Sequence, residues 1–246
     1  RLLRACDDLL FKFCAGKTPR PPAIFVTSLA RGGTTALLNA MHSLSAVATH
    51  EYGDMPLISA PLLWSKIAGN RQRKVARIER AHNDGLSIDL GSPEAFEEVL
   101  WHLFWPEKYQ KDKISLWKEV DFDSKIKRIF TCHFDKICYL RNRENAGDQG
   151  KRYLSKNNAN IGRLGLLPKI FPGCRIVIPL RDPSAHAASL FRQHLHFSAI
   201  QQEHSFVSQY MKDIGHFEFG KLHRPICFDG VGDYKGSPSD PDYWLV

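Results

Sequence analysis

The segment Arg31-Gly32-Gly33-Thr34-Thr35 combines an arginine, two glycines and two hydroxyls just ahead of an apolar, helix-like pattern. Glycine has no Cβ, so it lets the backbone close around a ligand. Backbone N–H groups at the N-terminus of a helix point outward, and the helix dipole favours negative charge there. The segment therefore predicts a binding site for a phosphate or a similar anion.

The segment differs from the phosphate loop of ATP- and GTP-binding proteins, which has the form Gly-x-x-x-x-Gly-Lys-Ser/Thr. Ser28 stands at the position of the first glycine, and Thr34 stands at the position of the lysine. Because that lysine reaches the β- and γ-phosphates, its replacement indicates a phosphate binder that does not handle a magnesium triphosphate. Arg31, directly before the glycines, supplies positive charge instead.

A second group of residues with phosphate-binding chemistry follows the apolar segment 175–180. Arg181-Asp182-Pro183 comes directly after that segment, and Ser189 stands eight positions after Arg181. The planar guanidinium of arginine matches the geometry of a phosphate, so Arg181 and Ser189 are candidates to bind one phosphate together. The alternative, a local ion pair between Arg181 and Asp182 at a strand–helix turn, stays open.

Two charged residues end other predicted strands. Lys156 follows the segment 152–155, and it either reaches into the same cleft or stays solvated, as most lysines do. Glu51 follows the short segment 47–50, where a carboxylate either serves as a general base or is a surface acid in a turn. Three nearby residues are further candidate bases: Asp54, His50 and His42.

The elements that must position these residues alternate between short apolar segments and amphipathic ones. We expect strands at residues 23–27, 47–50, 86–90, 115–120, 152–155 and 175–180. We expect helices at residues 1–14, 34–43, 56–68, 71–82, 93–104 (with Ser92 as N-cap), 123–140, 161–171, 183–196 and 199–216. This order predicts an α/β protein in three layers, a parallel sheet flanked by helices. Ligands of such sheets bind beyond the carboxyl ends of the strands.

Composition sets the class of protein. A chain of 246 residues with 43% hydrophobic and 24% charged residues is typical of a soluble globular protein. We expect one domain over residues 1–246, with its core at 22–216. The net charge of +8 favours an anionic ligand; nucleic acid is the weaker alternative, because basic residues are locally dense only at 66–80 and 125–143.

The six cysteines show no C-x-x-C pair and no zinc-binding spacing, so we expect buried or free thiols and no metal. Such thiols favour a reducing compartment. No apolar run approaches about 18 residues, and no signal-peptide pattern is visible. We therefore expect a cytoplasmic protein. A lumenal Golgi fragment is the alternative for a eukaryotic chain, because the sequence begins with arginine rather than methionine.

Together these motifs resemble the 3′-phosphoadenosine 5′-phosphosulfate (PAPS)-dependent sulfotransferase superfamily, nearer its protein-tyrosine and bacterial branch than its cytosolic steroid and phenol enzymes. The family's 5′-phosphosulfate loop, Arg-Ser-Gly-Thr-Thr, matches residues 31–35. Its 3′-phosphate motif, Arg-Asp-Pro with a later serine, matches residues 181–183 and Ser189. A Lys-x-Pro-x-Asn-like segment matches residues 156–160, and Phe-Pro at 171–172 precedes the strand that leads to Arg-Asp-Pro.

The resemblance covers residues 23–196 and implies a P-loop NTPase-like sulfotransferase fold. It implies transfer of a sulfuryl group from PAPS to a hydroxyl or amine by in-line displacement, with no metal. It places the 5′-phosphosulfate on Arg31, Gly32, Gly33, Thr34 and Thr35, and the 3′-phosphate on Arg181 and Ser189. It implies that Arg31 and Lys156 stabilise developing charge and that Glu51 is the general base.

The sequence departs from the family pattern in four places. Gly32 stands where serine is usual, Asn158 stands where the family has proline, and Gln193 stands where an arginine is sometimes found. The C-terminal loop that closes over the 3′-phosphate and the adenine is not recognisable, so either residues 228–246 are its beginning or the chain is truncated.

Two other classes of protein stay open. One is a nucleotide-binding protein of kinase type, although the phosphate loop lacks the lysine that such a protein needs. The other is a module that binds adenosine 3′,5′-bisphosphate (PAP) without catalysis. Within the sulfotransferase interpretation, the acceptor is a carbohydrate, a peptide tyrosine or a small molecule. Its specificity is expected to lie in residues 53–72 and 197–210.

Overall fold

The computed structural model describes residues 2–14, 20–69, 78–79, 87–144, 150–228 and 236–245. At its centre, the described strands form a parallel sheet in the order β2-β6-β1-β7. These strands are Val47–Ala48, Arg152–Lys156, Ile24–Val26 and Arg175–Val177. Since all of them run in the same direction, their carboxyl ends meet at one edge of the sheet, where the predicted ligand site belongs.

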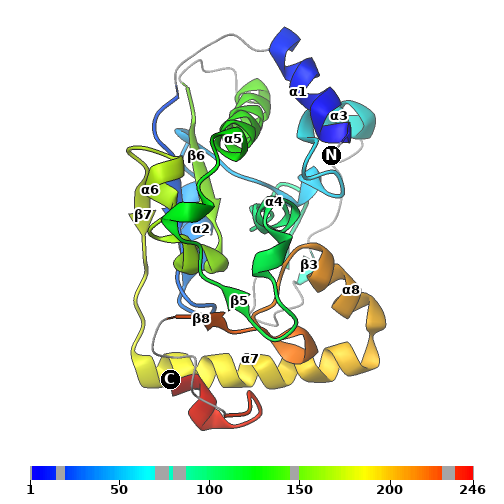
Figure 1. Ribbon diagram of the computed structural model, residues 1–246. Coiled ribbons are helices and arrows are strands. Elements are labelled where there is room, and N and C mark those ends of the chain that lie inside the picture. Colours follow the sequence, from blue (N-terminus) through cyan, green and yellow to red (C-terminus); the bar gives the residue numbers. More distant parts are fainter. Residues whose placement is uncertain are drawn as a thin grey trace.

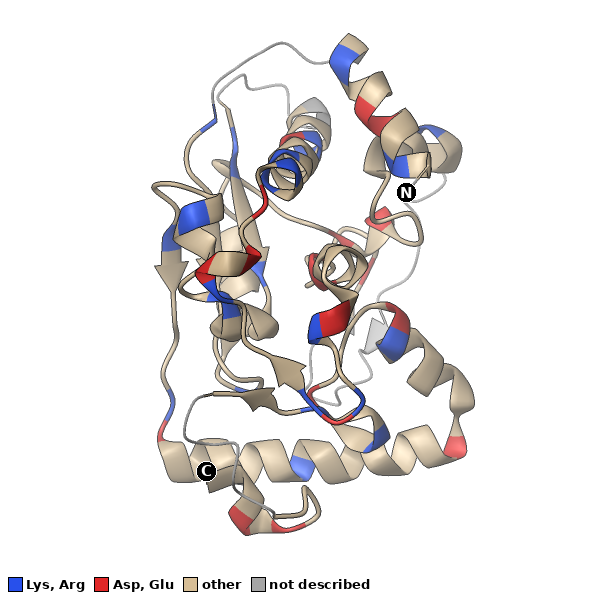
Figure 2. Ribbon diagram, viewed as in Figure 1, with Lys and Arg blue, Asp and Glu red and all other residues tan. Residues whose placement is uncertain are grey.

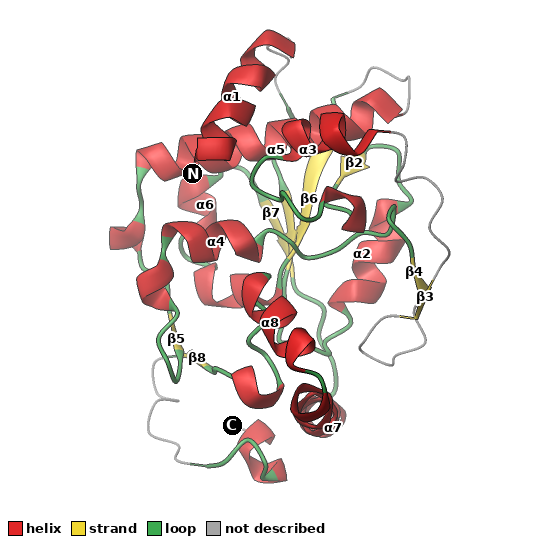
Figure 3. Cartoon of the chain, turned by 90° about the vertical axis from the view of Figure 1, so that its right-hand side faces the viewer, coloured by secondary structure: helices red, strands yellow, loops and turns green. Residues whose placement is uncertain are grey.

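Successive side chains of each strand point to opposite faces of the sheet, and helices cover both faces (Figures 1 and 3). Val26 and Leu154 pack with Leu38 of α2 (Thr34–His42) on one face. Phe25 points to the other face, where it packs with α5 (Ser124–Glu144) and with α6 (Leu167–Ile170). The predicted α/β architecture, a parallel sheet flanked by helices, is confirmed.

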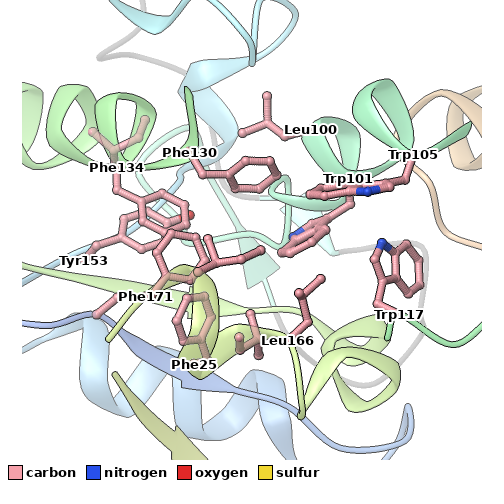
Figure 4. Close-up of a cluster of buried hydrophobic side chains, with 14 of the residues drawn as sticks. Phe25, Leu100, Trp101, Trp105, Trp117, Phe130, Phe134, Tyr153, Leu166 and Phe171 are labelled. Carbon is pink, nitrogen blue, oxygen red and sulfur yellow. The ribbon is translucent and has the colours of Figure 1, made fainter. Parts of the chain in front are cut away.

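The α5 face of the sheet holds a large aromatic core (Figure 4). Phe134 stacks on Tyr153 with ring centroids 3.7 Å apart, and Trp101 stacks on Trp105 at 5.0 Å. Trp101 belongs to α4 (Glu98–Phe104), which this cluster fixes against α5 and the sheet. Each fully buried aromatic side chain contributes about 1.5–3 kcal/mol of transfer free energy, so the sheet edge is held on a rigid base.

The remaining elements surround this unit. Helix α1 (Leu2–Cys14) packs on α3 (Pro61–Ala68). Helix α7 (Pro183–Glu203) crosses below the sheet in Figure 1 and carries α8 (Ser205–Asp213) and the C-terminal 3₁₀ turn Pro241–Leu245. Two small pairings complete the fold: β3 (Ile78–Glu79) with β4 (Ser87–Ile88), antiparallel, and β5 (Ile114–Ser115) with β8 (Ile226–Cys227), parallel. No described helix is long and apolar enough to span a bilayer.

Two predicted helices are wrong, each for a local reason. The helix expected at 93–104 begins only at Glu98: Pro93 pairs with Glu51 in a β-bridge, and the N–H of Glu94 bonds the carbonyl of His50 at 3.0 Å. Ser92 is not its N-cap. The helix expected at 161–171 is replaced by the 3₁₀ segment Asn158–Arg163 and the short α6, because Pro168 has no N–H and allows only a new helix start.

Other boundaries differ as well, and the helix expected at 56–68 begins only at Pro61. Helix α7 runs unbroken to Glu203 where two helices were expected, and the break falls at His204, whose backbone is extended. The strand expected at 115–120 ends at Ser115, and residues 119–121 form a 3₁₀ turn. The helix expected at 71–82 is a strand at Ile78–Glu79, and the rest of that range lies outside the described residues.

Candidate active site

The loop after β1 has an unusual backbone. Arg31 has φ +67° and Gly33 has φ +92°, both in the left-handed region. A non-glycine residue held there costs about 1–3 kcal/mol, and such strain is typical of functional loops. At Gly32, a Cβ would collide with the Ser28 side chain unless that side chain moved. Gly33 is the N-cap of α2 and has no capping side chain, so the first amides of α2 are left for a ligand.

Arg181 and Ser189 both reach the loop after β1. One guanidinium nitrogen of Arg181 donates to the carbonyl oxygen of Arg31 at 3.1 Å. The Nε of Arg31 donates to the Oγ of Ser189, a buried residue on α7, at 3.2 Å. Asp182 instead caps α7, accepting from the N–H of Ala185 at 2.8 Å. The two segments predicted to bind phosphate therefore contact each other.

The segment after β6 is fixed to the same loop. Lys156 ends the strand and is buried. Asn158, which replaces the family's proline, accepts from the Thr34 hydroxyl through Oδ1 at 3.0 Å, and its carbonyl accepts from Thr27 at 3.2 Å. Asn157 donates to Glu98 at 2.6 Å. Hydrogen bonds to the loop after β1 and to α4 therefore hold the segment that follows Lys156.

These elements surround a cavity of about 230 Å³ at the carboxyl edge of the sheet. Its lining includes six of the eight residues predicted to contact the donor, namely Arg31, Gly33, Thr34, Thr35, Lys156 and Arg181, whereas Gly32 and Ser189 are not among the described lining residues. Three of these side chains are cationic, which favours a polyanionic ligand. Elsewhere on the molecule, Lys and Arg are dispersed among Asp and Glu rather than gathered on one face in the view of Figure 2.

Residues 22–222 match the family described as the sulfotransferase family. That range contains β1, the phosphate loop, the lysine segment and the Arg181–Ser189 group. The chain belongs to the sulfotransferase family. No curated protein matches it. Membership supports a transferase and sulfuryl transfer as the general chemistry of the site. Among the described residues, no group of three or more His, Cys, Asp or Glu side chains is placed to hold a metal ion.

In this sulfotransferase, the carboxylate of Glu51 lies next to Arg141 and His42. Its Oε1 lies 3.0 Å from the Nε of Arg141 and 3.8 Å from the Nε2 of His42. Glu51 is not among the described residues that line the cavity. Its backbone forms a β-bridge with Pro93.

The other candidate bases are also engaged. Arg141 contacts both carboxylate oxygens of Asp54, at 2.7 and 2.8 Å. Burial alone would raise the pKa of Asp54, but Arg141 and His50 hold it well below its usual range. The Nδ1 of His50 lies 3.2 Å from Asp54, and its Nε2 lies 3.0 Å from the Nε2 of His133. Burial lowers the pKa of His42, and the charge of Arg141 lowers it further.

Glu94 is the carboxylate that the sequence did not reveal. It lines the cavity together with Lys156 and His216, and it is buried. Its oxygens accept from the Tyr52 hydroxyl and from the N–H of Ala95, both at 2.6 Å. Burial would raise the pKa of Glu94, but Lys156 and then His216 lower it to about 2. Glu94 falls within the helix wrongly expected at 93–104, so no pattern distinguished it.

A second, mainly apolar cavity of about 290 Å³ adjoins the first, and the two share Ala30, Asn158 and Glu218. Its aromatic lining includes Phe228 and Trp244 from the C-terminal part of the chain. His223 connects this part to the body, since its Nε2 lies 2.8 Å from the Tyr243 hydroxyl. The C-terminal segment, which has no recognisable family motif, therefore forms part of the wall of the second cavity.

Proposed function

We propose that this sulfotransferase transfers the sulfuryl group of PAPS to a hydroxyl or amine acceptor. The observation that carries the proposal is the link between two phosphate motifs: Arg31 joins the loop after β1 to Ser189 on α7. A donor with a single phosphate group has no use for both motifs. PAPS has a 5′-phosphosulfate and a 3′-phosphate, one for each.

The cavity and its neighbour fit the parts of this donor. The amides at the start of α2 and the hydroxyls of Thr34 and Thr35 would hold the 5′-phosphosulfate. Arg181 and Ser189 would hold the 3′-phosphate. The apolar second cavity, with Trp244 at its wall, offers an aromatic surface for the purine.

The reaction is an in-line displacement at sulfur, in which the acceptor oxygen or nitrogen forms a bond to sulfur. The bond between sulfur and the bridging oxygen breaks, and PAP leaves with that electron pair. As in phosphoryl transfer, such a step depends on positioning and on charge stabilisation. Lys156, buried at the cavity wall, and Arg31 would stabilise the negative charge that develops on the bridging oxygen and the sulfuryl oxygens.

The acceptor must also lose its proton to a base. Glu51, the base that the sequence predicts, meets this need only if its carboxylate exchanges Arg141 for the acceptor. The identity of the acceptor is left to experiment, with carbohydrate, peptide tyrosine and small phenols as its classes.

The direct test is transfer of ³⁵S from labelled PAPS to a panel of a tyrosine peptide, an amino-sugar oligosaccharide and p-cresol, with EDTA present. We expect labelled product from at least one class and release of PAP in equal amount. Binding of PAP without any PAPS turnover would instead support the non-catalytic module. Phosphoryl transfer from ATP that requires magnesium would support the kinase-type alternative.

A further inference from the structure

We propose that Glu94, rather than Glu51, accepts the proton of the attacking nucleophile. This inference rests on the proposed sulfuryl transfer and names the base for it. Two glutamates lie close to the carboxyl end of β2. Glu51 forms a β-bridge with Pro93, and Glu94 directly follows Pro93. Of the two, Glu94 lines the cavity that also holds the loop residues and Lys156.

Glu94 is held in a defined orientation. Its N–H bonds the carbonyl of His50 at 3.0 Å, which anchors its backbone to the end of β2. The Tyr52 hydroxyl donates to Oε2 and the Ala95 N–H donates to Oε1, both at 2.6 Å. Each carboxylate oxygen has a second lone pair. A proton acceptor that is positioned in advance loses no conformational freedom when the nucleophile arrives.

The charges around Glu94 keep it ionised until the donor binds. Lys156, His216, Tyr52 and Tyr210 are the titratable groups that act on it or are affected by it. Burial raises the pKa of Tyr210 to about 12, and the negative charge of Glu94 contributes to that rise. A phosphosulfate beside Lys156 would offset the lysine's charge and so increase the proton affinity of Glu94. The base would then become stronger when the donor is present.

Glu51 is placed differently. Arg141 from α5 and His42 from α2 lie on its carboxylate, and Arg141 also binds Asp54. If Glu51 took the proton, its carboxylate would become neutral and the buried guanidinium of Arg141 would lose one of its charged partners. Removing one partner of a buried charge pair is costly. We infer that Glu51 positions Arg141 and the end of β2, whereas Glu94 touches the nucleophile.

The step balances without any further reagent. The nucleophile's oxygen forms a bond to sulfur, its proton passes to a carboxylate oxygen of Glu94, and the bridging S–O bond breaks as PAP leaves. Water serves as a nucleophile of the same kind, so hydrolysis of PAPS to PAP and sulfate reports this step without an identified acceptor.

The experiment compares Glu94→Gln, Glu94→Asp and Glu51→Gln with the wild type, using PAPS as the probe and water as the acceptor. PAP affinity is measured by calorimetry, and PAPS cleavage is measured with excess enzyme and ³⁵S-labelled PAPS. Glu119→Gln, an exposed residue paired with Lys169, is the matched control. Removal of a general base lowers such rates by about 100- to 10,000-fold.

We expect Glu94→Gln to bind PAP within about threefold of the wild type and to cleave PAPS at least about 100-fold more slowly. We expect Glu94→Asp to recover part of that loss. The proposal is overturned if Glu94→Gln keeps its rate while Glu51→Gln loses it. It is also overturned if both Glu94 variants lose PAP binding, which would make Glu94 structural. Failure of the wild type to bind PAP would instead reject the proposed function itself.

Discussion

Arg31 donates from its Nε to the Oγ of Ser189 at 3.2 Å, although 158 positions separate the two residues in the sequence. The contact joins the loop after β1 to the second turn of α7. Arg181 adds a second link by donating to the carbonyl of Arg31. Two phosphate motifs that look independent in the sequence are therefore one structural unit, and this unit makes specific predictions about binding.

Ser189→Ala should weaken PAP binding more than AMP binding, because the role that we propose for its hydroxyl is to bind the 3′-phosphate, which AMP lacks. A lost hydrogen bond to a charged group costs about 1.5–3 kcal/mol, which corresponds to roughly 10- to 100-fold in affinity. Calorimetry with PAP and with AMP measures the change in affinity for each nucleotide. Ser198→Ala, on the same helix but bonded only to the carbonyl of His194, is the control. An equal loss for AMP and PAP would contradict the assignment.

Lys156→Met should lower turnover much more than it lowers donor affinity. The methionine keeps the apolar stem of this buried residue but removes the charge that we propose stabilises the leaving group. We expect a drop of about 100- to 1,000-fold in the rate of PAPS cleavage. Lys169→Met, at an exposed position, controls for loss of a positive charge. A variant that retained the wild-type rate would remove Lys156 from the mechanism.

Glu98 and Arg163 form a buried ion pair under the lysine segment. The guanidinium donates twice to the carboxylate at 2.7 Å and lies between the rings of Trp101 and Trp117, 4.3 and 4.0 Å from their centres. Arg163→Met should lower the free energy of unfolding by about 3–5 kcal/mol, because the carboxylate of Glu98 stays buried without its partner. Urea denaturation measures the loss. Replacing both residues by apolar ones should cost less, and a larger loss in the double variant would contradict this account.

His223 should make stability depend on pH. Burial lowers its pKa to about 4, although the carbonyl of Glu218 acts in the opposite direction. Between about pH 6.5 and 4 the unfolded chain binds more protons at this position than the folded chain, so stability is full above pH 6.5 and falls on acidification. We expect His223→Gln to lose less stability than the wild type between pH 7 and pH 5 in urea titrations. Equal losses of stability in the variant and the wild type would show that His223 does not contribute to the pH dependence.

The sequence was sufficient for the architecture and for most of the cavity. Glycine turns and apolar strands follow from local chemistry, and parallel strands bring their carboxyl ends together, so Arg31, Thr34, Lys156 and Arg181 were predicted near one another and are found there. Pairing with distant backbone was not predictable in the same way. Residues 93–94 have a helical pattern but pair with residues 50–51, because tertiary hydrogen bonds outweigh weak local propensity.

The position of the carboxylates depended on that pairing. Glu51 follows a strand, which predicts a side chain at the edge of the sheet, but no sequence pattern indicates that Arg141 of α5 reaches it. Glu94 has no distinguishing pattern, since its position depends on the β-bridge between Glu51 and Pro93 and on the hydrogen bond from Tyr52. The two glutamates could be told apart only from the cavity that one of them lines.

The most direct test of the account is calorimetric titration of the chain with PAP and with AMP, both in the presence of EDTA. The linked site of Arg31, Ser189 and Arg181 predicts that PAP binds at least about 100-fold more tightly than AMP, since the 3′-phosphate gains charge-assisted hydrogen bonds. It also predicts that chelation of metal has no effect. Equal affinity for the two nucleotides, or binding that requires magnesium, would contradict the assignment of PAPS as the donor.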